Sequence, residues 1–134
     1  MADVYAMVVP TEIVGKVRFT FMPDGSLATI SLRSCAVLGS SNGESGPRPK
    51  QAPSVAAVAR WLRDYMAGNA GDFPGVWANP GKTEFAQRVY AAVAKLPAGK
   101  TMSYGEVAVA VGSPGASRAV GTAMGRNPIP LVVP

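Results

Sequence analysis

The N-terminal part of the chain carries the apolar pattern of a small β-sheet. Val4 to Val9 and Val14 to Phe21 are predicted to be strands, the second because it is rich in β-branched and aromatic residues. Pro23-Asp24-Gly25 has the composition of a turn, and Leu27 to Leu32 makes a third predicted strand. The short separations favour a meander or a pair of hairpins.

A polar stretch and one amphipathic helix complete this first part. Gly39 to Pro53 is rich in Gly, Ser and Pro, which predicts a mobile surface loop. A helix ended by Gly68 is expected next, because apolar residues recur at helical spacing in Val55, Val58, Leu62 and Tyr65 or Met66. Asn69 to Gly81 is again rich in Gly and Pro and is interpreted as a linker. Strands followed by a helix predict an α+β domain over residues 1–79, linker included.

Residues 80–134 are predicted to form a second, helical domain. Thr83 is placed to cap its first helix, which Pro97 and Gly99 terminate; the apolar positions are Phe85, Val89, Ala92, Val93 and Leu96. The whole chain is therefore expected to be α+β, with a strand-helix domain before a helical one.

Thr101 to Pro134 has the pattern of two short helices and a loop that enters a strand. Ser103 and Glu106 predict a capping box, and Gly112 is expected to end the apolar stripe formed by Tyr104, Val107, Ala108 and Val111. Ser113 and Pro114 are expected to open the second helix, with Gly125 past its end and three residues turned inward: Ala119, Val120 and Ala123. This arrangement fits a helix-turn-helix, whose second helix enters a DNA groove, although many helical hairpins share the spacing.

The net charge of +5 is concentrated in the predicted helical domain. From Pro80 onward six basic residues stand against two acidic ones, a net of +4, whereas the first 79 residues hold seven basic and six acidic ones. A basic excess over a helix-turn-helix suits a phosphate backbone as partner. A solvated basic face is the alternative that charge alone leaves open.

Composition limits the other classes of function. The 48% apolar content is that of a globular protein, and no run approaches the roughly 20 apolar residues that span a bilayer. With one cysteine and no histidine we expect no disulfide framework and no zinc or other metal site. Cys35 lacks a nearby base, which favours a buried structural thiol. A start without a basic lead-in favours a cytoplasmic protein.

The residue identities in the C-terminal segment are more specific evidence than its hydrophobic periodicity. The runs TEFAQRVYAAVAKLPAGKTMSYGEVA, PGASRAVGTAMGRNPIP and LVVP cover about two fifths of the chain. They resemble the DNA-binding and active-site domain of the O6-alkylguanine-DNA alkyltransferases (methylated-DNA–protein-cysteine methyltransferases). The resemblance implies DNA repair by direct transfer of a methyl or alkyl group from guanine O6 to a protein nucleophile, without a cofactor. The partner would be double-stranded DNA containing O6-alkylguanine, and we expect a monomer.

The resemblance also assigns roles to individual residues. An alkylated guanine must leave the base stack to be reached, and Arg118 matches the arginine that enters the stack in its place. Tyr104 matches the tyrosine that crowds the 3′ phosphate and helps to rotate the nucleotide. The alternatives are an exposed helix arginine for Arg118 and core packing for Tyr104, although a tyrosine can bury its ring and present its hydroxyl.

Five further residues are expected to support the site. Asn127 matches a hinge residue that hydrogen bonds the backbone, so that the helix-turn-helix and the nucleophile loop stay in register. Met124 and Pro130 match the edge of the base pocket, where a core Met and a turn Pro would look the same. Ser117 and Thr122 lie near the same helix face and are candidates for phosphate contact.

The family pattern continues with Pro-Cys-His-Arg, whereas the sequence ends at Pro134. We therefore expect the 134 residues to lack the nucleophile, and to expose Ile129, Leu131, Val132 and Val133. A selenocysteine codon interpreted as a stop is the explanation we favour, over a nonsense mutation or a sequence cut for another reason. The alternative functions are a non-catalytic binder of alkylated DNA, an inactive remnant, or a helix-turn-helix transcription regulator.

Overall fold

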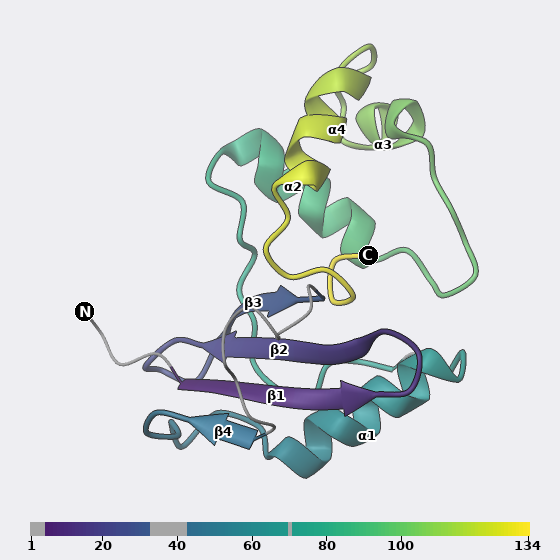
Figure 1. Cartoon of the computed structure of the whole chain (residues 1–134). Helices are drawn as coiled ribbons and strands as arrows, with labels where there is room; N and C mark the ends of the chain where they lie inside the picture. Colours follow the sequence, from purple (N-terminus) through teal and green to yellow (C-terminus); the bar gives the residue numbers. More distant parts are fainter. Residues whose placement is uncertain (1–4, 33–42, 70) are drawn as a thin grey trace. The chain divides into compact units, whose positions relative to one another are not determined.

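The computed structural model describes residues 5–32, 43–69 and 71–134, and they divide into two compact units. Unit 1 is Met1–Ala78 and unit 2 is Asn79–Pro134. Unit 1 holds a small antiparallel sheet and one helix, and unit 2 holds three helices (Figure 1). The α+β prediction is therefore confirmed.

The sheet of unit 1 has the strand order β3-β2-β1-β4. Its strands are β1 (Tyr5–Thr11), β2 (Gly15–Phe21), β3 (Leu27–Ser31) and β4 (Gly43–Ser45). In the β1–β2 register Tyr5 faces Phe21 and Met7 faces Phe19, so these four buried side chains share one face of the sheet. The three predicted N-terminal strands are confirmed within a residue at most boundaries.

Helix α1 (Val55–Met66) lies along one face of the sheet (Figure 1). Ser54 caps it by accepting a hydrogen bond from the Ala57 backbone N–H at 3.1 Å. Trp61 meets Phe19 and Phe73 edge-on, with ring centroids 6.4 and 5.1 Å apart. Burying such side chains contributes roughly 1.5–3 kcal/mol each, which makes this cluster the centre of the unit's core.

Two predictions about unit 1 are wrong in part. The surface loop predicted over Gly39 to Pro53 contains β4, which pairs with β1 because backbone groups at a sheet edge accept a partner whatever its side chains. Asn69 to Gly81 is not a free linker: Phe73 is buried and stacks on Phe19, and Trp77 forms a bridge with Leu27. Burial of the Phe73 side chain fixes the segment on the sheet although its Gly and Pro content is typical of a linker.

Unit 2 consists of α2 (Glu84–Ala94), α3 (Tyr104–Ala110) and α4 (Ser117–Gly125). Thr83 caps α2 as predicted, accepting a hydrogen bond from the Ala86 N–H at 3.1 Å. The buried residues of the three helices are Val89, Tyr90, Val93, Val107, Ala108, Val120 and Ala123. Contacts join α3 to α4 and α2 to both, which makes α2 the support of the helix pair.

The entry to α4 differs from the prediction. Pro114 does not open a helix; Ser113 to Ala116 form a turn closed by a 3.1 Å hydrogen bond from the Ala116 N–H to the Ser113 carbonyl. Gly115 has a φ of 85°, so the turn has Pro and then a left-handed Gly at its centre, as a type II turn requires. Helix α4 thus begins at Ser117, and this shift leaves Ala119 exposed rather than inward.

The last residues also depart from expectation. Residues 128–132 form bends and turns rather than a strand, with Leu131 at a φ of 75°. Ile129 and Val133 are buried, at 1% and 0% exposure, contrary to the expectation that they are exposed.

Cys35 and Val4 lie outside the described residues, so the predicted setting of the thiol stays a prediction. Among the residues described, none belongs to a helix both long and apolar enough to cross a membrane.

Candidate nucleic-acid interface

A capping box fixes the start of α3 and therefore the position of Tyr104. The Glu106 backbone N–H donates to Ser103 Oγ at 3.1 Å, and the Ser103 N–H donates to Glu106 Oε2 at 2.6 Å. These two bonds satisfy backbone donors that a helix start otherwise leaves free. The predicted box is confirmed, and it places Tyr104 at the first helical position.

Two side chains of α2 hold the ends of the other helices. The buried Tyr90 hydroxyl donates to the Ala123 carbonyl of α4 at 2.6 Å, and burial raises the pKa of that hydroxyl. Arg88 Nη1 donates to the Val111 carbonyl at the end of α3 at 3.3 Å. Neither residue was predicted to take part, because α2 periodicity shows which side chains face inward but not what their polar ends meet.

Tyr104 does not pack into the core as its place in the apolar stripe suggests. Its side chain is 52% exposed, whereas Val107 and Ala108 of the same helix are buried. Its ring lies against α4 at Gly121, where a built Cβ would come within 3.0 Å of Tyr104 Cε2 and 3.2 Å of Cδ2. Tyr104, the first residue of α3, therefore lies beside α4 with much of its ring exposed to solvent.

The outer side of α4 carries Arg118. Gly121 follows it by three residues, so the two lie on neighbouring positions of one helix face. Ser117, Arg118 and Thr122 are all exposed. The Thr122 hydroxyl donates to the Arg118 carbonyl at 3.1 Å, so its only donor is engaged inside the helix and is not presented to a phosphate.

Asn127 closes the segment that follows α4. Its Nδ2 donates to the Val133 carbonyl at 2.6 Å, and its Oδ1 accepts from the Ile129 N–H at 3.0 Å. A 3.1 Å backbone bond from the Val133 N–H to the Ile129 carbonyl completes the closed turn. Met124 and Pro130 are half-buried on either side of Asn127 in sequence.

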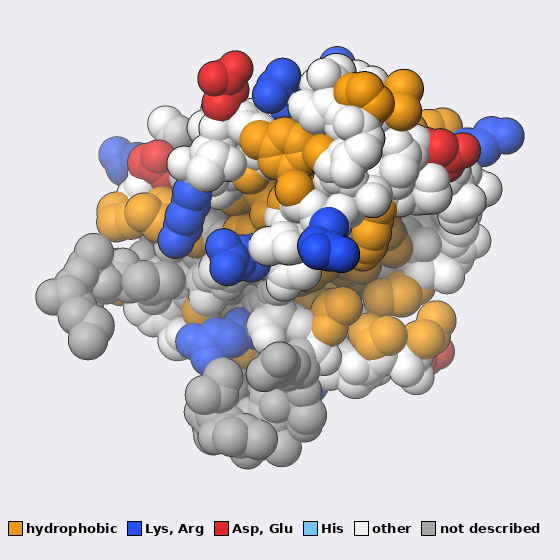
Figure 2. Space-filling view, turned by 90° about the horizontal axis from the view of Figure 1, so that it is seen from above, with side chains coloured by type: hydrophobic (Ala, Val, Ile, Leu, Met, Phe, Trp, Pro, Cys, Tyr) orange, Lys and Arg blue, Asp and Glu red, His pale blue; other side chains and the backbone are white. Residues whose placement is uncertain are grey.

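The basic side chains of unit 2 are open to solvent. All six Lys and Arg residues of unit 2 are exposed, namely Lys82, Arg88, Lys95, Lys100, Arg118 and Arg126. Figure 2 views the molecule from the side where α3 and α4 lie, and its Lys and Arg side chains are spread among apolar ones rather than gathered in one block. Of the two acidic residues in the unit, Glu106 is engaged in the capping box.

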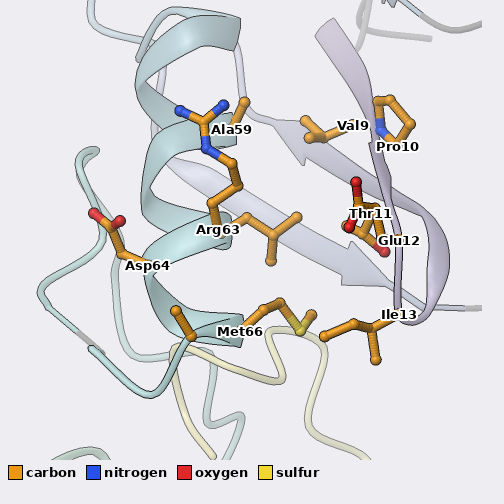
Figure 3. Close-up of a pocket in the computed structure, with 11 residues that line it drawn as sticks. Val9, Pro10, Thr11, Glu12, Ile13, Ala59, Arg63, Asp64 and Met66 are labelled. Carbon is orange, nitrogen blue, oxygen red and sulfur yellow. The ribbon is translucent and has the colours of Figure 1, made fainter.

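A separate cleft of about 770 Å³ lies in unit 1 between α1 and the β1–β2 hairpin (Figure 3). Its lining combines apolar side chains with a few charged ones and includes Ile13, Leu62, Arg63, Asp64 and Met66. None of the site residues predicted from the sequence borders this cleft.

Comparison with known proteins agrees with this geometry. Residues 84–134 match the family model of the 6-O-methylguanine DNA methyltransferase DNA-binding domain. A Mycobacterium leprae methylated-DNA–protein-cysteine methyltransferase is 45% identical over 86 residues, which is 64% of this chain and 51% of that protein. The constitutive Bacillus subtilis methyltransferase of the same name is 41% identical over 85 residues, 63% of this chain and 51% of that protein.

Solved structures extend the likeness to nearly the whole chain. The Mycobacterium tuberculosis O6-methylguanine methyltransferase crystal structure has a TM-score of 0.74 at 29% identity, covering 98% of this chain and 75% of that one. The structure of Mycobacterium tuberculosis OGT in complex with DNA has a TM-score of 0.72 at 30% identity, covering 96% of this chain and 74% of that one. The chain belongs to the O6-methylguanine-DNA methyltransferase family.

The chain spans about half the length of the curated methyltransferases that it matches. The segment that matches the DNA-binding model is the one that carries Tyr104, Arg118 and Asn127. Helices α2, α3 and α4 all lie within this matched segment.

Proposed function

We propose that this chain binds duplex DNA containing O6-alkylguanine and brings the damaged nucleotide out of the stack for direct alkyl transfer. The observation that carries the proposal is the pairing of a half-exposed Tyr104 with the Arg118 face of α4, in a segment matching the family's DNA-binding model. The aromatic ring and the cation project from neighbouring helices held by α2, as a wedge and a support for a rotated nucleotide require.

The two side chains have separate tasks in this proposal. Arg118 enters the stack in place of the target base, compensates its lost pairing by hydrogen bonding, and is attracted to the duplex by charge. Tyr104 crowds the phosphate 3′ of the target, which favours rotation of the nucleotide. Extrusion costs a few kcal/mol in stacking and pairing, and these contacts must offset that cost.

The remaining site residues support the pocket. Asn127 keeps residues 127–133 in one closed turn. In this proposal Met124, near the end of α4, and Pro130, in the turn, border the extruded base. Ser117 contacts backbone phosphate with its exposed hydroxyl. Thr122 does not donate to a phosphate in this proposal, because its hydroxyl donates to the Arg118 carbonyl within the helix.

Alkyl transfer itself needs a nucleophile in register after Pro134, a cysteine or a selenocysteine. Its sulfur or selenium would bond to the alkyl carbon while the carbon–O6 bond breaks, and the electron pair would return to the guanine, which takes up a proton.

Binding to matched duplexes tests the proposal. We expect tighter binding to a duplex with one O6-methylguanine than to the same duplex with guanine, in each of two unrelated sequence contexts. Fluorescence anisotropy at one fixed salt concentration measures both affinities. Equal affinity for damaged and undamaged DNA, with a preference between the two contexts, would instead identify a sequence-specific regulator.

Arg118 variants test the assignment of the wedge. Arg118→Ala is expected to abolish the preference for the damaged duplex and to weaken binding roughly tenfold, as loss of a charge-assisted contact would. Arg118→Lys keeps the charge but not the planar, stacking guanidinium, so it should retain undamaged-DNA affinity and lose damage preference. If Arg118→Ala leaves the preference intact, Arg118 is only an exposed basic residue.

A further inference from the structure

Gly121 stands where the ring of Tyr104 meets α4. A methyl group at that position would lie 3.0 Å from Cε2 and 3.2 Å from Cδ2 of the ring, closer than ordinary van der Waals contact, while Cζ would be at 3.9 Å. The ring therefore occupies space that any other residue type would fill with its Cβ. Val120 and Ala123 on either side are buried, which fixes the rotation of α4 beneath the ring.

The other glycine of the helix shows that this contact is specific to one position. A Cβ added at Gly125, also on α4, would meet nothing within 4 Å. Inside a helix glycine is less favourable than alanine by about 1 kcal/mol, so an unpacked glycine has no local structural benefit. Gly121 differs because its missing side chain admits an aromatic ring from α3.

Tyr104 needs such a contact to have a defined orientation. Because 52% of its surface is exposed, Tyr104 has only part of the burial that immobilises an aromatic side chain. A side chain that acts on a phosphate must be held in its working geometry before the DNA arrives, because ordering it during binding costs rotamer entropy. The backbone of α4 at Gly121 provides a rigid surface for that purpose.

We propose that Gly121 is a positioning residue that seats the Tyr104 ring against α4, so that the hydroxyl is presented to the target strand. This inference rests on the proposed function, in which Tyr104 acts on the damaged nucleotide. Gly121 acts through Tyr104 and need not touch the DNA. The seat couples the first residue of α3 to the helix that carries Arg118.

The contact itself is testable without DNA. In the NMR spectrum of the full chain, the Gly121 Hα protons should be shifted upfield by the ring and show cross-peaks to the Tyr104 ring protons. Gly121→Ala should be less favourable for stability than Gly125→Ala, the matched control whose Cβ meets nothing within 4 Å, as urea denaturation measures. In the Tyr104→Ala background, Gly121→Ala should become stabilising, because the added methyl then enters free space.

The function of the seat is tested by base extrusion. The probe is a duplex with O6-methylguanine and 2-aminopurine on its 3′ side, whose fluorescence rises when the target leaves the stack. Gly121→Ala should reduce the extrusion equilibrium constant roughly tenfold, as expected for residues in contact. Anisotropy with undamaged duplex should change less than twofold, and Gly125→Ala should match the wild type in both measurements.

The double variant decides between a seat and a direct DNA contact. If Gly121 acts through Tyr104, adding Gly121→Ala to Tyr104→Ala should cause no further loss of extrusion. A persisting loss would mean that the methyl clashes with DNA itself, and an unchanged Gly121→Ala would mean that the ring needs no seat; both results overturn the inference. If Gly121→Ala alone does not fold, recovery of folding in the double variant demonstrates the same contact.

Failure of the proposed function gives a different result. Wild-type chain that causes no fluorescence rise on the damaged duplex contradicts extrusion, while the NMR shifts and the stability cycle still report whether Gly121 seats the ring. Absence of the ring-current shift and of stability coupling overturns the seat whatever the DNA measurements show.

Discussion

Tyr90 is the residue whose polar end most directly sets the position of α4. Its buried hydroxyl donates to the Ala123 carbonyl, which also accepts a 3.2 Å hydrogen bond from the Arg126 N–H. Removal of this hydroxyl loses one buried hydrogen bond, and such a bond contributes about 0.5–1.5 kcal/mol.

We therefore expect Tyr90→Phe to lower the free energy of unfolding by about that amount, measured by urea denaturation followed by circular dichroism. Tyr65→Phe, at a half-buried position of α1, is the matched control and should change stability by less than about 0.5 kcal/mol. Equal stability of the two variants would show that α4 does not depend on the Tyr90 hydrogen bond.

Tyr5 predicts a loss of stability at alkaline pH. Burial first, and then its hydrogen bond to Glu44, raise the pKa of Tyr5 from 10.0 to about 12. The folded state then keeps a proton that the unfolded state releases, so stability is unchanged by this group below pH 10 and falls between 10 and about 12. Urea denaturation at a series of pH values should show this fall.

Tyr5→Phe should reduce the alkaline fall without removing it, because burial also raises the pKa of Tyr90. A variant with the same alkaline slope as the wild type would show that Tyr5 titrates alike in the folded and unfolded chain.

Helical periodicity predicted the burial of single residues well in the middle of an apolar stripe and poorly at the ends of helices. Val107 and Ala108 are buried as expected, whereas Tyr104, at the first position of the same stripe, is half-exposed. A residue in the first turn of a helix has no preceding turn whose side chains could cover it. Its exposure therefore depends on which other element of the fold lies next to it. The glycine of α4 that passes beside Tyr104 is not identifiable from spacing.

At the scale of elements, the turn between α3 and α4 depends on backbone geometry. Helix α3 ends with backbone bonds from Gly112 N–H to the Val109 carbonyl and from Ser113 N–H to the Ala108 carbonyl, at 3.0 and 2.9 Å. The Ser113–Ala116 turn follows at once, with Gly115 at a positive φ. The angle between the two helices is thus determined over a few residues.

Gly115→Ala is expected to destabilise the chain by about 1 kcal/mol, because an L-residue with a side chain is strained in the left-handed region. Damage binding should weaken with it, since α4 would be presented at another angle. Gly125→Ala is the control here also, as its φ is not in that region and its Cβ position is open. A stabilised Gly115→Ala variant would show that the turn relaxes to another conformation.

Elements with a local cause were predictable, and elements with a distant cause were not. The caps at Thr83 and Ser103 follow from residues three positions apart, so the sequence contains the whole interaction. Strand β4 exists because β1 has a free edge, and nothing in Gly43–Ser45 itself signals it. Pro114 fits both a helix start and the second position of a turn; the glycine after it favours the turn.

At the scale of the molecule, charge is divided unevenly between the units. The exposed basic residues of unit 2 outnumber its acidic ones by six to two, and binding to duplex DNA should therefore release counterions. If all six contacted phosphate, the logarithm of the affinity would fall with the logarithm of salt concentration with a slope of roughly −5.

We expect a measured slope between zero and that limit, determined by anisotropy over a series of salt concentrations. Lys100→Ala or Lys82→Ala should make the slope shallower by about one if that side chain lies on a phosphate, without changing the preference for damaged DNA. An affinity that does not change with salt concentration would contradict a phosphate-contacting interface.

Two of the nine residues of α4 are glycines, which affects how the DNA interface unfolds on heating. Together they make the isolated segment a poor helix, so a synthetic peptide of residues 117–125 should be unstructured in water. Its helical shape is supplied by Val120 and Ala123 packing in the unit and by the Tyr90 bond. Heating should accordingly end DNA recognition and the packing of α2 in a single transition, leaving no temperature at which a free recognition helix persists.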